Sequence, residues 1–107
     1  MIKLSILYPN TKNSTFDMDY YLNTHMPLCK QLLGSTLKGM MVEEGVGGVL
    51  PGSKPAYKTI CHLFFDSIDA FVEAFTPHAE VLQGDIPNYT NTEPIIQYSE
   101  IKMHQQL

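Results

Sequence analysis

Residues 56–71, AYKTICHLFFDSIDAF, carry the clearest structural pattern in the chain. This stretch begins as a strand, because β-branched and aromatic residues alternate as far as Phe65 and apolar side chains fall on both faces. A strand that is apolar on both faces is expected to be covered on both. Asp66 or Ser67 then caps a helix that carries Phe71 on its apolar side. A buried strand followed at once by a capped helix predicts a sheet with helices packed on it.

Two further elements precede this stretch. Residues 2–8 alternate and predict a first strand. Ser14 or Thr15 is expected to cap a helix that begins near Phe16, carries a wide apolar face and ends at Gly34.

Three more elements complete the order. Residues 37–49 predict a long, glycine-rich strand, and residues 94–103 a last one. A helical piece restarts at Pro77 and ends at Gly84. The order is therefore βαββαβ, the ferredoxin-like α+β arrangement of an antiparallel four-stranded sheet with two helices on one face. We expect residues 1–107 to form a single domain.

The composition narrows the class of partner. Apolar residues make up 44% of the chain and charged residues 17%, against about a quarter in an average protein, which excludes a disordered tail. All seven positive residues are Lys, and the net charge is −4, so no nucleic-acid partner is expected. The absence of Arg disfavours a site that clamps phosphate.

Signals for location are few. Cys29 and Cys61 lie far apart with no zinc-ligand spacing, and unpaired thiols indicate a reducing cytoplasm. The first apolar run is too short for a signal peptide, and no apolar run is long enough to span a membrane. We expect a cytoplasmic protein with no membrane contact.

The second face of the sheet predicts an oligomer. Helices cover only one face, whereas Ile60, Phe64 and the region 40–42 indicate that the other is also apolar. We therefore expect a homodimer in which two open sheet faces pack together.

His25 is the leading candidate for chemistry. Pro27 lies inside a helical pattern, lacks an N–H and clashes with the carbonyl of Asn23, so the helix should kink beside His25. Tyr21 lies one turn earlier on the same face. A histidine in an apolar cleft serves as an acid or base near neutral pH, with the tyrosine hydroxyl as a donor. Alternatively, His25 binds a carbonyl freed by the kink and only holds the bend.

The other candidates are ligand-binding residues. His78 faces the cleft, as a base or an axial haem ligand, or lies at the surface. Asn88 and Tyr89, in the polar loop after the second helix, form either a rim over the cleft or an ordinary turn, and Tyr8 ends the first strand. No two histidines have metal-ligand spacing, so we expect neither a metal nor a cofactor.

The chain resembles the EthD family, named for ethyl tert-butyl ether degradation, within the dimeric α/β-barrel superfamily. The resemblance rests on FDMDYYLNTHMPL (residues 16–28), FFDSIDAF (64–71) and DIPNYTNTEPIIQYSEI (85–101). It implies a ferredoxin-like protomer, a homodimer, and a pocket between sheet and helices. The histidine of the family's H-x-P-L segment falls on His25, and its aromatic partner on Tyr21.

This resemblance implies three alternative functions. The first is a cofactor-independent enzyme of oxidoreductase, monooxygenase, dehydratase or isomerase type, acting on a small apolar or aromatic compound through His25. The second is a non-catalytic binding or carrier protein that serves an oxygenase. The third is haem binding through His78. Haem-degrading relatives use a Trp, which this chain lacks.

Overall fold

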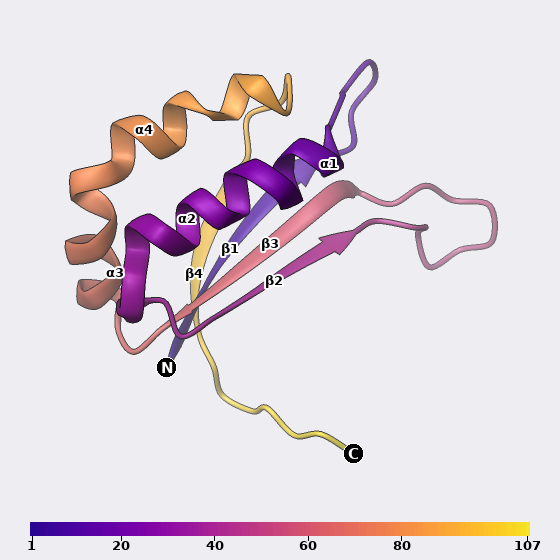
Figure 1. Cartoon of the computed structure of the whole chain (residues 1–107). Helices are drawn as coiled ribbons and strands as arrows, with labels where there is room; N and C mark the ends of the chain where they lie inside the picture. Colours follow the sequence, from indigo (N-terminus) through magenta and orange to yellow (C-terminus); the bar gives the residue numbers. More distant parts are fainter.

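The computed structural model describes all 107 residues. Four strands form one antiparallel sheet in the order β2-β3-β1-β4. Their bounds are β1 (Ile2–Pro9), β2 (Gly39–Glu44), β3 (Tyr57–Phe65) and β4 (Ile95–Glu100). The two central strands are β1 and β3, so β2 and β4 are the edges (Figure 1).

Two helical segments connect the strands. The first contains α1 (Met18–Tyr20), the π-helix η1 (Tyr21–His25), α2 (Met26–Leu33) and the 3-10 turn η2 (Gly34–Thr36). The second contains α3 (Ile68–Phe75), η3 (Thr76–His78), α4 (Ala79–Gly84) and η4 (Ile86–Asn88).

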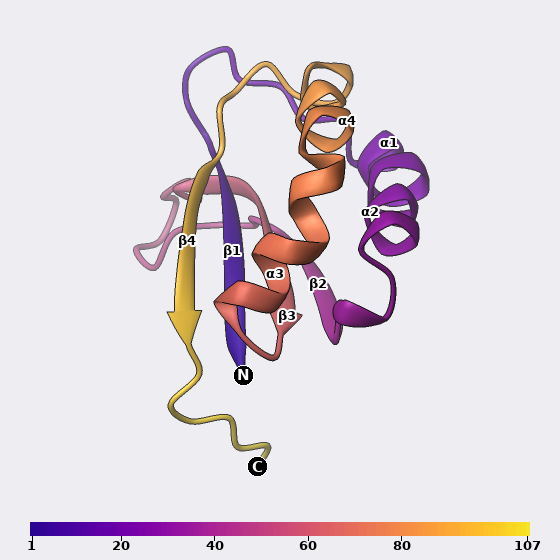
Figure 2. The same ribbon diagram turned by 90° about the vertical axis from the view of Figure 1, so that its left-hand side faces the viewer.

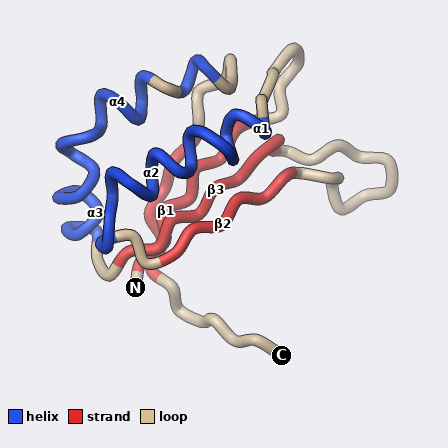
Figure 3. The backbone as a smooth tube through the Cα atoms, in the orientation of Figure 1, coloured by secondary structure: helices blue, strands red, loops and turns tan.

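All of the helices lie on one side of the sheet (Figures 2 and 3). The predicted ferredoxin-like βαββαβ order is confirmed. None of the helices combines the length and apolarity that crossing a membrane requires.

The core lies between the sheet and the helices. Alternate residues of the central strands point toward the helices, so that Leu4 pairs with Leu63 and Ile2 with Phe65. Phe65 is completely buried and packs edge-on against Phe71 of α3. Burying these side chains is the main source of stability for such a layer.

The helix starts agree only in part with the sequence prediction. Ser67 caps α3, where its hydroxyl accepts a hydrogen bond from the Ala70 N–H. The prediction for the first helix was wrong, because neither Ser14 nor Thr15 caps it. Asp17 does so instead, accepting from the Tyr20 N–H at 3.0 Å, since only from that position does a side-chain oxygen reach the free amide.

The second strand is shorter than predicted and ends at Glu44 instead of reaching Val49. Gly45 explains this end: a Cβ there would meet the carbonyl oxygen of Tyr57 within 3.0 Å, so only glycine fits where the chain turns away. Residues 45–56 form a long loop that projects from the sheet (Figure 1).

The open face of the sheet carries a row of three hydrogen-bonded polar side chains. Ser5 Oγ lies 2.9 Å from His62 Nδ1, and His62 Nε2 lies 3.1 Å from Glu43 Oε1. These three side chains link β1, β3 and β2 on the side away from the helices. The remaining residues on this face include the half-buried Leu7, Ile60 and Phe64, which no helix covers.

Candidate functional site

An apolar cavity of about 280 Å³ lies between the sheet and the helices. Its floor includes Leu4 and Leu63 from the central strands, and its wall includes Phe71 of α3. Small-molecule sites of about 300 Å³ and above are usual, so this volume suits a small ligand. No lysine lines the cavity, and thirteen of its seventeen lining residues are hydrophobic, which favours a neutral ligand.

The π-helix brings His25 to this cavity. The Met26 N–H donates to the Tyr21 carbonyl oxygen five residues back, in place of the usual four. Pro27 explains the change of register, because it has no N–H to give to Asn23 and its ring would clash with that carbonyl. The predicted kink is thus a wider turn just before Pro27. It places the rings of Tyr21 and His25 parallel, 5.3 Å apart.

His25 is held by Asp85. Its Nδ1 lies 2.8 Å from Asp85 Oδ2, and the exposed fraction of the His25 residue is only 6%. His25 Nε2 makes no hydrogen bond within the chain, yet the only fully buried side-chain atoms without partners are Ser14 Oγ and Thr59 Oγ1. Nε2 therefore reaches accessible space beside the cavity that His25 lines.

The Asp85 carboxylate has three donors. It accepts the Tyr20 hydroxyl at 2.6 Å and the Asn88 amide at 2.9 Å, besides His25. Burial raises the pKa of Asp85, but these hydrogen bonds outweigh the burial and lower the pKa below its ordinary value. An ionised Asp85 favours the His25 tautomer that carries its proton on Nδ1, which leaves Nε2 as a proton acceptor.

Two buried tyrosines complete the polar end of the cavity. Tyr8 of β1 and Tyr89 both line it, and their hydroxyl oxygens lie 2.8 Å apart. Burial raises the pKa of both tyrosines above the ordinary value, so both stay neutral. Tyr89 also lies against the His25 ring, with centroids 4.7 Å apart.

The structure brings some of the predicted site residues together and leaves others out. His25, Tyr8 and Tyr89 all line the cavity. Tyr21 does not: it is buried behind them, with an exposed fraction of 1%, and packs edge-on against Tyr8. The Tyr21 ring stacks on the His25 ring.

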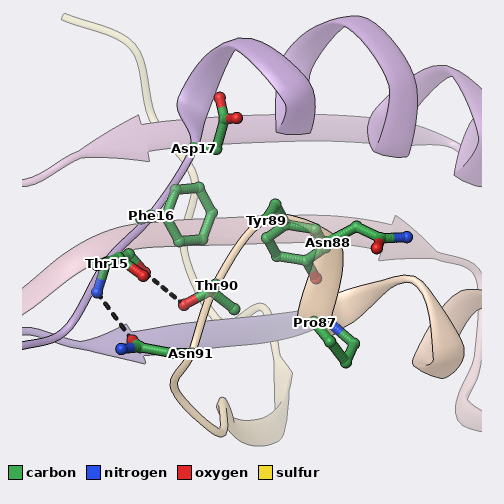
Figure 4. Close-up of a pocket in the computed structure, with 8 residues that line it drawn as sticks. All are labelled: Thr15, Phe16, Asp17, Pro87, Asn88, Tyr89, Thr90 and Asn91. Atoms are coloured by element: carbon green, nitrogen blue, oxygen red, sulfur yellow. Dashed lines mark hydrogen bonds between the residues drawn. The ribbon is translucent and has the colours of Figure 1, made fainter.

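His78 and Asn88 also lie outside the cavity lining. His78 ends η3, where it is half-buried and makes no side-chain hydrogen bond. Asn88 contacts Asp85 and lines a polar surface hollow with Thr15 and Asn91 (Figure 4). In that hollow the Thr15 N–H donates to Asn91 Oδ1, which ties the two loops together.

Sequence reasoning missed three site residues. Asp85 contacts His25, and Tyr20 contacts Asp85; their sequence positions carried no signal beyond turn and helix character. Cys29 lines the cavity one helical turn after His25. Burial raises the pKa of Cys29 to about 12, which makes it an apolar wall rather than a nucleophile. No group of three or more His, Cys, Asp or Glu is arranged to hold a metal ion.

Comparisons with known proteins identify the family. Residues 10–93 match the EthD domain. No curated protein matches the chain. An EthD-like protein from Ralstonia eutropha JMP134 is 38% identical with a TM-score of 0.93, over 97% of this chain and 94% of that one.

Two more distant structures show the same fold. An EthD family protein from Bacillus halodurans C-125 is 19% identical, with a TM-score of 0.64, over 94% of this chain and 98% of that one. HapK from Hahella chejuensis is 12% identical, with a TM-score of 0.59, over 100% of this chain and 99% of that one. The resemblance seen in the sequence is confirmed, and the chain belongs to the EthD domain family.

Proposed function

We propose that this protein is a cofactor-independent enzyme that moves a proton on a small, neutral, largely apolar molecule held in the cavity. His25 is the acid–base group, and Nε2 is the atom that exchanges the proton. The observation that carries the proposal is the 2.8 Å contact of His25 Nδ1 with Asp85, because it leaves Nε2 unpartnered beside an apolar cavity.

The proton-transfer step follows from this geometry. A substrate C–H next to a carbonyl, or a phenolic O–H, gives its proton to Nε2 and becomes an enolate or phenolate. The imidazolium that forms is stabilised by the Asp85 carboxylate across the Nδ1 hydrogen bond. Returning the proton to another atom of the substrate completes an isomerisation or prepares a dehydration. A cofactor-independent oxygenase would begin its reaction from the same enolate or phenolate.

The cavity lining favours an aromatic substrate. Phe71 stacks on Phe75 at 5.1 Å and meets Tyr98 of β4 edge-on at 5.8 Å, so one end of the cavity has an aromatic wall. His25 and Tyr89 lie at the polar end. A flat ring with one oxygen substituent satisfies both ends, with its ring among the phenylalanines and its oxygen toward His25.

A proton-exchange assay tests the proposal without a known substrate. The probe is 2-tetralone, a neutral bicyclic ketone whose α-protons exchange with D₂O, followed by ¹H NMR. We expect the protein to accelerate the exchange and His25→Ala to lower that acceleration by at least about 100-fold. His78→Ala is the matched control, because His78 lies outside the cavity. Equal rates for His25→Ala and the unmodified protein would exclude His25 as the base.

A non-catalytic carrier is the second candidate, and one observation favours it. The hydroxyls of Tyr8 and Tyr89 bind each other rather than pointing to a ligand, so the cavity offers few groups for chemistry beyond His25. A carrier binds 2-tetralone but leaves its α-proton exchange at the rate of buffer. Binding is measured by the shift of cavity amides in ¹⁵N NMR spectra.

We also propose that the protein is a homodimer joined through the open sheet face. Leu7, Ile60 and Phe64 on this face have no helix over them. Two such faces packed together would exclude water from these side chains. Light scattering at micromolar concentration should give twice the mass of the chain, 12.1 kDa.

A further inference from the structure

The loop between β2 and β3 carries the two most exposed large apolar side chains among residues 2–106. Val46 and Val49 are 97% and 103% exposed, and Leu50 is 72% exposed. Over residues 45–56 the only charge is Lys54. The loop projects from the sheet, on the side away from the helices (Figure 2). Apolar side chains displayed in this way, without charges among them, mark a contact with another surface.

A second apolar surface without a partner lies at the mouth of the cavity. The cavity is lined on its β4 side by Ile96 and Tyr98, which are 54% and 44% exposed although they belong to its wall. Ile95, on the other face of the same strand, is 53% exposed. Because β4 is an edge strand, the cavity is incomplete along this edge in a single chain.

We infer that the β2–β3 loop of a second copy of this chain closes the cavity at β4. The inference rests on the proposed function in one respect, that the cavity is the ligand site. It adds that each site is built from two copies, with Val49 and Leu50 of one copy covering Ile96 of the other.

Two-fold symmetry between two open sheet faces brings the loop of one copy to β4 of the other. The sheet order is β2-β3-β1-β4, so a two-fold axis parallel to the strands, between two open faces, stacks β2 of one copy against β4 of the other. The loop leaves the sheet at the end where Glu44 pairs with Thr59, and Thr59 pairs with Tyr8. The strand β4 begins at that same end, where Ile95 pairs with Leu7. The other aligned packing, with the axis across the strands, places β2 on β2 and leaves both apolar surfaces exposed.

The loop is also long enough to reach the mouth of the cavity in the other copy. With about six residues on either side of its tip, it reaches up to about 20 Å from the sheet. Packed sheets lie about 10 Å apart. The loop tip therefore extends past the plane of the opposite sheet and around the edge of β4 to the mouth of the cavity. Lys54 is the only charged residue of the loop, and no Lys, Asp or Glu lines the cavity, so little charge has to be desolvated when the two surfaces meet.

Disulfide trapping tests the inference without any ligand. In the double variant Leu50→Cys with Ile96→Cys, the new thiols should join two chains under mild oxidation. We expect a covalent dimer on a non-reducing gel at least about 100-fold faster than for colliding chains, because thiols in one interface have a millimolar effective concentration. Peptide mapping should place the bond between the two introduced thiols. The native Cys29 and Cys61 are buried and do not interfere.

Matched controls define the outcome. The pair Glu73→Cys with Ile96→Cys places one thiol on the exposed side of α3 and should form no covalent dimer. Each single variant should also stay uncrosslinked. A monomer by light scattering, a covalent dimer through two loop thiols, or crosslinking no faster than in the control pair would each overturn the inference. If the crosslink forms but the unmodified protein does not bind 2-tetralone, the interface stands and the proposed function fails.

Discussion

His25 Nδ1 lies 2.8 Å from Asp85 Oδ2, although 60 positions separate the two residues in the chain. The contact joins the π-helix η1 to the turn that ends α4 and fixes which ring nitrogen is free. If Asp85 orients the base, Asp85→Asn should lower 2-tetralone exchange by about 10- to 100-fold while binding is retained. Asn88→Ala, which removes only one donor to the carboxylate, should have a smaller effect. An unchanged exchange rate in Asp85→Asn would show that His25 does not depend on this partner.

The hydroxyl pair of Tyr8 and Tyr89 predicts a coupled effect on stability. Each single change to Phe leaves the other buried hydroxyl without its partner, which costs about 1–3 kcal/mol of unfolding free energy. Changing both to Phe removes the unpaired group, so the double variant should lose less than the sum of the two single losses. Urea unfolding of all four proteins measures this coupling. Strict additivity would mean that the hydroxyls do not interact in solution.

The two cysteines should be inert in the folded protein. Burial raises the pKa of Cys29 to about 12 and that of Cys61 to about 11, so neither forms thiolate near pH 8. Ellman's reagent should detect no thiol in the native protein and both thiols in guanidinium chloride. Rapid reaction of the native protein would show that Cys29 is reached through the cavity mouth.

Asp85 also predicts how stability depends on pH. Its folded-state pKa lies below the ordinary value of 3.8, so its contribution is fully present above that value. The contribution is lost as the pH falls through 3.8 to the lower folded pKa, because the unfolded chain takes up the proton first. Thermal unfolding between pH 6 and pH 2 should therefore show a weaker acid dependence for Asp85→Asn than for the unmodified protein. If stability falls with pH in parallel for the two proteins, other carboxyl groups account for the loss of stability in acid.

Local pattern was sufficient for the architecture. The alternation of apolar residues in β1 and β3, the cap at Ser67 and the positive φ of 61° at Gly34 are properties of short stretches, and the structure shows each of them. The predicted ends of the helices and strands were less accurate. The glycine-rich stretch after Glu44 has strand-like neighbours, but the close approach of Gly45 to Tyr57 is set by a different strand.

The order of the elements, their apolar faces and the presence of His25 beside Pro27 all follow from local sequence. Periodicity, caps and the missing proline N–H act within one or two turns of the chain, so they can be read without the rest of the fold. The folded chain alone shows that Asp85 holds His25, that Tyr8 meets Tyr89, and that Tyr21 and His78 lie outside the cavity. These relationships depend on how helices cross the sheet and on which strands are neighbours, and no local pattern encodes them.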